Sequence, residues 1–369
     1  MKRYAWLISL ALLGACGGGS GEGGAAPPVT TAPLEWRATA SSEWPHSSAA
    51  AAGLSEAQLD QAFQAGRELP GLYGMLLLRR GALVGEAYYN GKGADDLLQL
   101  RSVTKTVMAT LIGMAIAEGT IASIDQPIAD YLAADYGVLL TNKPGLRIRD
   151  LLTMTAGLRW DESTAAGYND WVLSPDPTRY VLQREAVDPP GQRFAYNSGT
   201  SHLLSVILSK AAGLSTEQYA AQKLFAPLGI TRWGWARLGD GYHNGAADLQ
   251  LRARDLAKLA LLWQQGGRWQ QQQLVPADWM AAAGRSQISR SNPLGGLAIT
   301  DYGYLWWLGQ QGGQAFQLAW GYGGQFVLTL PGRDFSVVML NQHNVAQAPQ
   351  QESRSMGLLV QNVLPALLP

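Results

Sequence analysis

Cysteine is almost absent from this chain, because Cys16 is the single cysteine among 369 residues. One thiol cannot close an intrachain disulfide, and a cysteine-based metal site needs several thiolates. Histidine is also scarce, and no two of the four histidines have the spacing of residues that share a metal ion. We therefore expect no disulfide, no bound metal and no cofactor. The four histidines are His46, His202, His243 and His343.

Charged residues are few and balanced. They make up 15% of the chain, with 28 basic and 28 acidic residues and no run of one sign. Binding to a polyanion requires a basic surface, so we expect no nucleic-acid partner. The hydrophobic share of 47% is enough for a sizeable core and excludes a disordered chain.

Several chemical fingerprints are missing as well. The chain has no Gly-x-Ser-x-Gly elbow, which argues against an α/β-hydrolase. It also has no Walker A sequence and no dinucleotide-binding glycine fingerprint. An activated nucleophile, if there is one, must therefore come from a different motif.

The only notable apolar run at the N-terminus, from Tyr4 to Leu13, is too short to span a bilayer but fits the central region of a signal peptide. It leads into Leu13-Gly14-Ala15-Cys16, which resembles a bacterial lipobox. We expect residues 1–15 to be a signal peptide cleaved before Cys16, and Cys16 to be lipidated. The alternative is a plain secretory signal with a chance cysteine.

The expected location is the bacterial cell envelope, facing the periplasm. Gly17 is not the Asp that often retains lipoproteins at the inner membrane, which favours the outer membrane.

The stretch that follows the cysteine is rich in glycine, serine, alanine and proline and lacks apolar periodicity. Such a composition predicts a flexible tether over residues 16–52, with the folded domain over 53–369.

Two kinds of periodicity divide the folded part. Strand patterns near both ends of the domain enclose a middle region, roughly 121–262, of short helices broken by proline and glycine. A strongly apolar helix over 102–117 should be buried in the centre. This arrangement predicts an α+β fold: one antiparallel sheet of N- and C-terminal strands, flanked by helices, with an inserted, mostly helical lobe. A cleft between sheet and lobe is a natural place for a site. The other expected elements are helices over 55–67, 149–155, 199–212, 255–265 and 354–364, and strands over 75–79, 83–89, 302–308, 315–321, 325–330 and 335–340.

The apolar helix begins with Ser102-Val103-Thr104-Lys105. A serine hydroxyl is a poor nucleophile until a base takes its proton. Residues three apart share a helix face, which places Lys105 beside Ser102. Burial disfavours a charged ammonium, so this lysine can act as the base. The alternative is a helix-capping serine with a solvated lysine.

Two further segments carry candidate site residues. Tyr196 lies in a loop just before a predicted helix, from which a phenol can reach a cleft and relay a proton. The alternative for Tyr196 is a core tyrosine with a satisfied hydroxyl. Gly321-Tyr322-Gly323-Gly324-Gln325 enters a predicted strand, where glycines allow a substrate close to the backbone. An N–H there could pair with that of Ser102 as an oxyanion hole, or the glycines could simply form a turn or bulge.

Taken together, these segments resemble the serine β-lactamase and penicillin-binding-protein superfamily, whose first box is Ser-x-x-Lys. The resemblance runs from about Leu72 to Gln342 and is closest to the class C β-lactamase-like branch, in its 6-aminohexanoate-dimer hydrolase and esterase-like group. It implies that Ser102 is the nucleophile, Lys105 its base and Tyr196 the tyrosine of a Tyr-x-Asn box. The matching blocks are Arg101-Ser-Val-Thr-Lys-Thr106, Asp125-Gln-Pro-Ile-Ala-Asp-Tyr131, Arg149-Asp-Leu-Leu-Thr-Met-Thr-Ala-Gly-Leu158, Leu224-Phe-Ala-Pro-Leu-Gly-Ile230 and Arg254-Asp-Leu-Ala-Lys258.

Two positions depart from the lactamase pattern. Ser198 stands third in the tyrosine box, in the place of asparagine, and the Lys-Thr-Gly box aligns with Tyr322-Gly323-Gly324. Tyr322 carries no positive charge to hold a substrate carboxylate, whereas Gln325 would supply the second oxyanion N–H. Asp161, Glu162 and Tyr168 could line the cleft mouth, and among them the aromatic ring favours Tyr168 for a substrate contact. The alternative is that all three are solvated loop residues.

The expected activity is hydrolysis of an ester or linear amide bond of a small molecule through an acyl-enzyme on Ser102. One alternative is a D-amino-acid peptidase or β-lactamase acting on cell-wall-type substrates. The other, from a different class, is an inactive penicillin-binding-like scaffold of the envelope. The expected partners are the small-molecule substrate and, through Cys16, a membrane.

Overall fold

An eight-stranded antiparallel sheet is central to the fold in the computed structural model, which describes residues 34–38, 44–143 and 145–367. The strand order is β2-β1-β13-β12-β11-β10-β9-β8, so strands from the two ends of the domain pair directly, at β1 and β13. The predicted α+β fold is confirmed. The strands are β1 (Leu72–Arg79), β2 (Ala82–Tyr88), β8 (Ile288–Ser289), β9 (Ile299–Tyr302), β10 (Trp307–Gln311), β11 (Gln314–Gly321), β12 (Gln325–Leu330) and β13 (Phe335–Asn341).

Tight turns at residues with positive φ connect neighbouring strands. Arg80 and Gly81, with φ of 49° and 79°, join β1 to β2, and Asp334, with φ of 46°, leads into β13. The single strand predicted over 302–308 is wrong, because the chain turns after Tyr302 and forms two strands, β9 and β10. Leu305 lies in this turn with φ of 59° and bonds through its N–H to the carbonyl of Leu152 (2.9 Å), outside the sheet.

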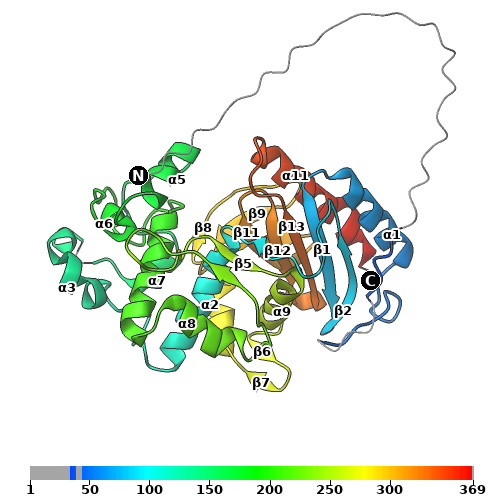
Figure 1. Cartoon of the computed structure of the whole chain (residues 1–369), viewed down its shortest axis with the longest axis horizontal. Helices are drawn as coiled ribbons and strands as arrows, with labels where there is room; N and C mark the ends of the chain where they lie inside the picture. Colours follow the sequence, from blue (N-terminus) through cyan, green and yellow to red (C-terminus); the bar gives the residue numbers. More distant parts are fainter. Residues whose placement is uncertain (1–33, 39–43, 144, 368–369) are drawn as a thin grey trace, which may run out of the picture. The chain divides into compact units, whose positions relative to one another are not determined.

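Helices cover both faces of the sheet (Figure 1). Helices α1 (Glu56–Ala65) and α11 (Ala348–Leu358) lie on one face, and α2 (Val103–Ala117) and α9 (Ala253–Gln264) on the other. The Ser55 side chain caps α1 by accepting the N–H of Gln58. Helix α11 begins earlier than the predicted 354–364 and continues in short turns to Ala366.

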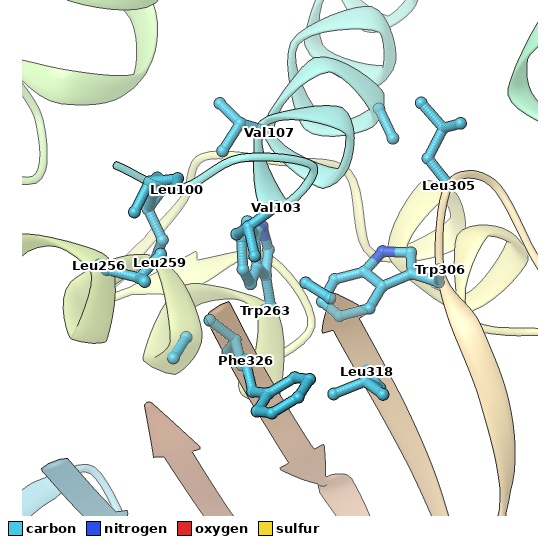
Figure 2. Close-up of a cluster of buried hydrophobic side chains, with 14 of the residues drawn as sticks. Leu100, Val103, Val107, Leu256, Leu259, Trp263, Leu305, Trp306, Leu318 and Phe326 are labelled. Carbon is cyan, nitrogen blue, oxygen red and sulfur yellow. The ribbon is translucent and has the colours of Figure 1, made fainter. Parts of the chain in front are cut away.

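The core between sheet and helices fixes the start of α2. Thirteen of the 15 residues of α2 are buried, which explains its apolar sequence. Figure 2 shows Val103 and Val107 of α2 beside Leu256, Leu259 and Trp263 of α9, above Leu318 and Phe326 of the sheet. Burial of each such side chain contributes about 1.5–3 kcal/mol to the free energy that stabilises the folded state. The residue that precedes α2 therefore sits on a rigid support.

The inserted lobe is helical, as predicted, and lies at the left of Figure 1. Its longest helix ends at Gly213, whose φ of 65° allows the left-handed C-cap. The predicted range 121–262 extends too far, because α9 packs on β1, β12 and β13 rather than in the lobe. The lobe helices are α3 (Ala129–Leu140), α4 (Ile148–Leu152), α5 (Ala165–Val172), α6 (Pro177–Leu182), α7 (Ser198–Ala212) and α8 (Thr216–Ala220).

Smaller elements connect the lobe to the sheet. A three-stranded sheet in the order β3-β5-β4 joins the segment before α2 to the segment before α9. The remaining elements are β3 (Leu98–Gln99), β4 (Gly234–Trp235), β5 (Leu249–Leu251), β6 (Arg268–Trp269), β7 (Gln272–Gln273) and α10 (Ala277–Ala283).

The tether predicted over residues 16–52 is wrong at its C-terminal end. Trp36 is buried, stacks on Phe63 at 4.8 Å and donates from Nε1 to Asp60 (2.6 Å). Trp44 is also buried, so residues 34–38 and 44–52 include chain that packs on the domain. The predicted signal peptide 1–15, Cys16 and the tether as far as residue 33 lie outside the described residues. Within the described part of the chain, no helix has the length and apolarity to cross a membrane.

Candidate active site

Ser102 occupies the N-cap position of α2 without using its side chain to cap the helix. Its half-buried hydroxyl instead meets the side chains of Lys105 and Tyr196. The preceding residue, Arg101, has φ of 47°, a conformation that non-glycine residues adopt at a cost. This sharp entry and the buried helix behind it present Ser102 to the inter-lobe side. The position at the positive end of the helix dipole favours negative charge on Oγ.

Lys105 points at the same hydroxyl from one turn further along α2. Its Nζ donates to Ser102 Oγ (2.8 Å), Ser198 Oγ (3.0 Å) and the carbonyl of Ala246 (3.0 Å), and the side chain is 2% exposed. Burial lowers the pKa of Lys105 to about 8, although the carboxylate of Glu162 acts in the opposite direction. A neutral amine is thus accessible at mildly alkaline pH, as a general base requires.

Tyr196 completes the group from the loop before α7. The Ser102 side chain is a polar neighbour that lowers the pKa of the Tyr196 phenol, and the ring centroid of Tyr196 lies 4.9 Å from Lys105 Nζ. The ring stacks on Trp307 at 5.8 Å with an interplanar angle of 19°. Burial raises the pKa of the Tyr196 phenol far above its usual value, so the phenol stays protonated and can donate. The structure therefore brings Ser102, Lys105 and Tyr196 together at one point.

Glu162 belongs to the site although the sequence pattern suggests a solvated loop residue. Ser198 accepts from Lys105 and donates from Oγ to Glu162 Oε1 (2.9 Å), while its N–H donates to Glu162 Oε2 (2.9 Å). Trp160 Nε1 also donates to this carboxylate (2.8 Å). The sequence signal that could have found Glu162 is Ser198 itself, since a hydroxyl can accept from the lysine and donate to a carboxylate.

Glu162→Gln is expected to lower the pKa of Lys105 further, because the variant loses a nearby negative charge that raises it. The midpoint of the rise of kcat/KM with pH should then shift below that of the wild type. Asp161→Asn is the matched control, since it removes one negative charge from an exposed neighbour. An unchanged midpoint in Glu162→Gln, measured over pH 6–10 (about the span needed for a group near 8), would contradict this electrostatic role.

The glycine-rich turn between β11 and β12 lies against the entry to α2. Gly321 approaches the carbonyl of Leu100 so closely that a Cβ would come within 2.4 Å of it. Gly323 and Gly324 have φ of 83° and 90°, which only glycine adopts readily. The Gln325 side chain is buried and engaged with the backbone of Tyr322 and Asn341. Any contribution of Gln325 to an oxyanion hole must therefore come from its backbone N–H.

Two tyrosines and an arginine surround the mouth of the site. The Arg101 guanidinium lies 5.8 Å from the ring centroids of both Tyr168 and Tyr322, and Tyr322 is 48% exposed. Arg101 also lies 3.9 Å from a carboxylate oxygen of Asp248, so its charge is partly balanced. The structure thus places Tyr168 beside Arg101, the residue before Ser102, and a role of Tyr168 in lining a cleft stays a prediction.

Comparisons with known proteins show the family to which the chain belongs. The beta-lactamase family matches residues 58–360. The 6-aminohexanoate-dimer hydrolase of Paenarthrobacter ureafaciens is 24% identical over 284 residues, which is 72% of this chain and 71% of the relative. A candidate 6-aminohexanoate-dimer hydrolase of Bacillus anthracis superposes with a TM-score of 0.70 at 17% identity, over 88% of each chain. A hydrolase with promiscuous acyltransferase activity superposes with a TM-score of 0.65 at 17% identity, over 82% of this chain and 99% of the other. With a match that runs from α1 to the end of the domain, the chain belongs to the beta-lactamase/transpeptidase-like family, which includes 6-aminohexanoate-dimer hydrolase homologues.

Proposed function

We propose that this protein is a serine hydrolase that cleaves ester or linear amide bonds of small molecules through an acyl-enzyme on Ser102. The observation that carries the proposal is the contact of one hydroxyl with two proton-transfer groups. Lys105 Nζ lies 2.8 Å from Ser102 Oγ, and the same Ser102 side chain acts on the Tyr196 phenol, whose ring centroid lies 4.9 Å from Lys105 Nζ.

The two partners have different protonation states and therefore different roles. Neutral Lys105 takes the proton of Ser102 as Oγ attacks the substrate carbonyl. Protonated Tyr196 gives its proton to the leaving alcohol or amine and regains one from Lys105. The N–H groups of Ser102 and Gln325 hold the oxyanion. Water then attacks the acyl-enzyme, with the same groups acting in reverse, and releases the acid.

The charges beside the site favour substrates without a free carboxylate over substrates that carry one. Arg101 is the cation beside Tyr322, and Asp248 stands 3.9 Å away from it. A substrate carboxylate would have to compete with that partner. The relative from Paenarthrobacter ureafaciens is named for hydrolysis of the 6-aminohexanoate dimer, and one structural neighbour is named as a hydrolase with acyltransferase activity. These names support cleavage of linear amide or ester bonds, whereas the preference for substrates without a carboxylate rests on Arg101 and Asp248 alone.

The test is active-site labelling together with a substrate screen. We expect a fluorophosphonate to modify the peptide that contains Ser102 and no other, as read by mass spectrometry. Chromogenic short-chain esters or ω-amino amides should be turned over, with little turnover of nitrocefin and little labelling by fluorescent penicillin. Rapid penicillin labelling or D-amino-acid peptide cleavage would favour a cell-wall enzyme instead. No labelling by any serine-directed probe would favour the inactive scaffold.

We also propose that the protein is a lipoprotein of the bacterial envelope, anchored through Cys16 after removal of residues 1–15. The support is the order of basic residues, apolar run and small residues before Cys16. In a bacterial host, the full chain should incorporate radiolabelled palmitate and fractionate with the outer membrane, and Cys16→Ala should do neither. Palmitate incorporation that survives in Cys16→Ala would refute the anchor.

A further inference from the structure

Two side chains of α11 hold the glycine turn before β12 by binding the backbone N–H and the backbone carbonyl of Gly323. Glu352 Oε1 accepts the N–H of Gly323 at 2.6 Å, and Gln351 Nε2 donates to the Gly323 carbonyl at 2.6 Å. Gln351 also donates to the carbonyl of Gln342 (2.7 Å), which ties the turn to the end of β13. The backbone of Gly323 is therefore fixed by two consecutive side chains of α11.

A second contact extends this support to the rest of the turn. Asn341 donates from its side chain to the Gly324 carbonyl and from its backbone to Gln325 Oε1 (2.9 Å). Ser355, one turn along α11 from Gln351, donates to the Asn341 side chain (3.1 Å). The residue expected to supply the second oxyanion N–H, Gln325, is thus connected to α11 as well.

Glu352 is an unusual residue for such a support. It is 6% exposed, and burial raises the pKa of its carboxyl to about 7. A buried carboxylate costs stability unless its hydrogen bonds compensate, and packing alone would be served better by an apolar side chain. This one touches none of Ser102, Lys105 or Tyr196 in the contacts described above, so its cost is not explained by the proposed chemistry.

The carboxylate has a second partner that leads to the other side of the site. The Trp320 side chain lies near enough to the Glu352 carboxyl to lower its pKa as a polar neighbour. The ring of Trp320 packs on Trp307 at 5.5 Å, and Trp307 stacks on Tyr196. One carboxylate therefore anchors the backbone of the oxyanion turn and the first of the two rings that hold the phenol in place.

We infer that Glu352 is a positioning residue, which sets the oxyanion turn through Gly323 and the Tyr196 ring through Trp320 and Trp307. Oxyanion donors and a proton donor act on the same substrate carbonyl, so their relative position governs the rate of acylation. This role rests on the proposed function.

The test compares variants that keep or remove the hydrogen-bond acceptor. Glu352→Met fills a similar volume without an acceptor and should lower kcat about tenfold or more, short of the 10²–10³ that follow loss of an oxyanion donor. KM should stay within about threefold, because ground-state binding is not the function of this residue. Glu352→Gln keeps an acceptor oxygen and should restore kcat to within about threefold of wild type. Trp320→Phe, which removes the indole N–H and one of the two fused rings, should give an intermediate loss.

The control is Ser353→Ala, an exposed position on the same helix, which should behave as wild type. Wild-type kcat in Glu352→Met would overturn the role, as would an equal loss in Ser353→Ala. If Glu352→Met does not fold, Gln351→Met and Trp320→Phe test the positioning role instead. Wild-type kcat in both variants would overturn that role. Fluorophosphonate labelling is measured throughout. If Ser102 is labelled and the kcat of Glu352→Met equals that of the wild type, only the positioning role is refuted. If Ser102→Ala retains turnover, the proposed function is refuted and the positioning role with it.

Discussion

Ser102→Ala is expected to lower kcat/KM for a chromogenic short-chain ester by about 10⁶-fold, the scale seen when a serine hydrolase loses its nucleophile. The alanine has no oxygen to form the acyl bond, and neither Lys105 nor Tyr196 can replace it. The hydroxyl does not cap α2, so its removal should leave the helix and the thermal stability nearly unchanged. The measurements are steady-state kinetics, fluorophosphonate labelling and thermal unfolding of the same preparations.

Ser353→Ala serves as the control for the loss of a serine hydroxyl away from the site. Its kinetics and labelling should match those of the wild type. Turnover by Ser102→Ala above a few per cent of wild type would be about 10⁴-fold above the expected residual activity. It would mean that a different group attacks the substrate, and the assignment of Ser102 would be wrong.

Loss of the base should have the second-largest effect. Lys105→Met is expected to reduce kcat/KM by about 10³-fold or more, within the range that general base catalysis contributes. Lys105→Arg should be no better, although it keeps the positive charge, because a guanidinium stays protonated and cannot accept the proton of Ser102. A Lys105→Arg variant with near-wild-type activity would show that Lys105 serves through its charge rather than as a base.

The pH dependence of the wild type tests the same assignment. The pKa of Lys105 is lowered from its ordinary 10.5 to about 8, so the reactive neutral form increases as the pH rises through that value. About one-tenth of Lys105 is neutral at pH 7 and about nine-tenths at pH 9. We expect kcat/KM to rise about tenfold per pH unit below 8 and to level off above it, since this parameter reports the free enzyme. A rate that falls between pH 7 and 9 would exclude a neutral-lysine base.

Local patterns in the sequence predict much of the framework. Apolar residues all around 102–117 predict a central helix, and the structure buries 13 of the 15 residues of α2. Glycines mark real helix ends and turns, as at Gly213 and Gly323, because these positions need positive φ. The strand pattern fails at 302–308, where a contact of Leu305 with distant Leu152 turns the chain. The tether prediction fails at its C-terminal end, where Trp36 and Trp44 pack on Phe63 and Trp269.

The sequence by itself determines the nucleophile candidate and its base, since Ser102 and Lys105 lie one helical turn apart and their proximity follows from helix geometry. Only the tertiary structure decides what surrounds them. Tyr196 and Glu162 reach the site through long-range packing of lobe, loop and sheet, and Glu352 reaches the oxyanion turn from α11, near the C-terminal end of the described chain. Such contacts depend on which distant segments the core brings together, and no local periodicity encodes that choice.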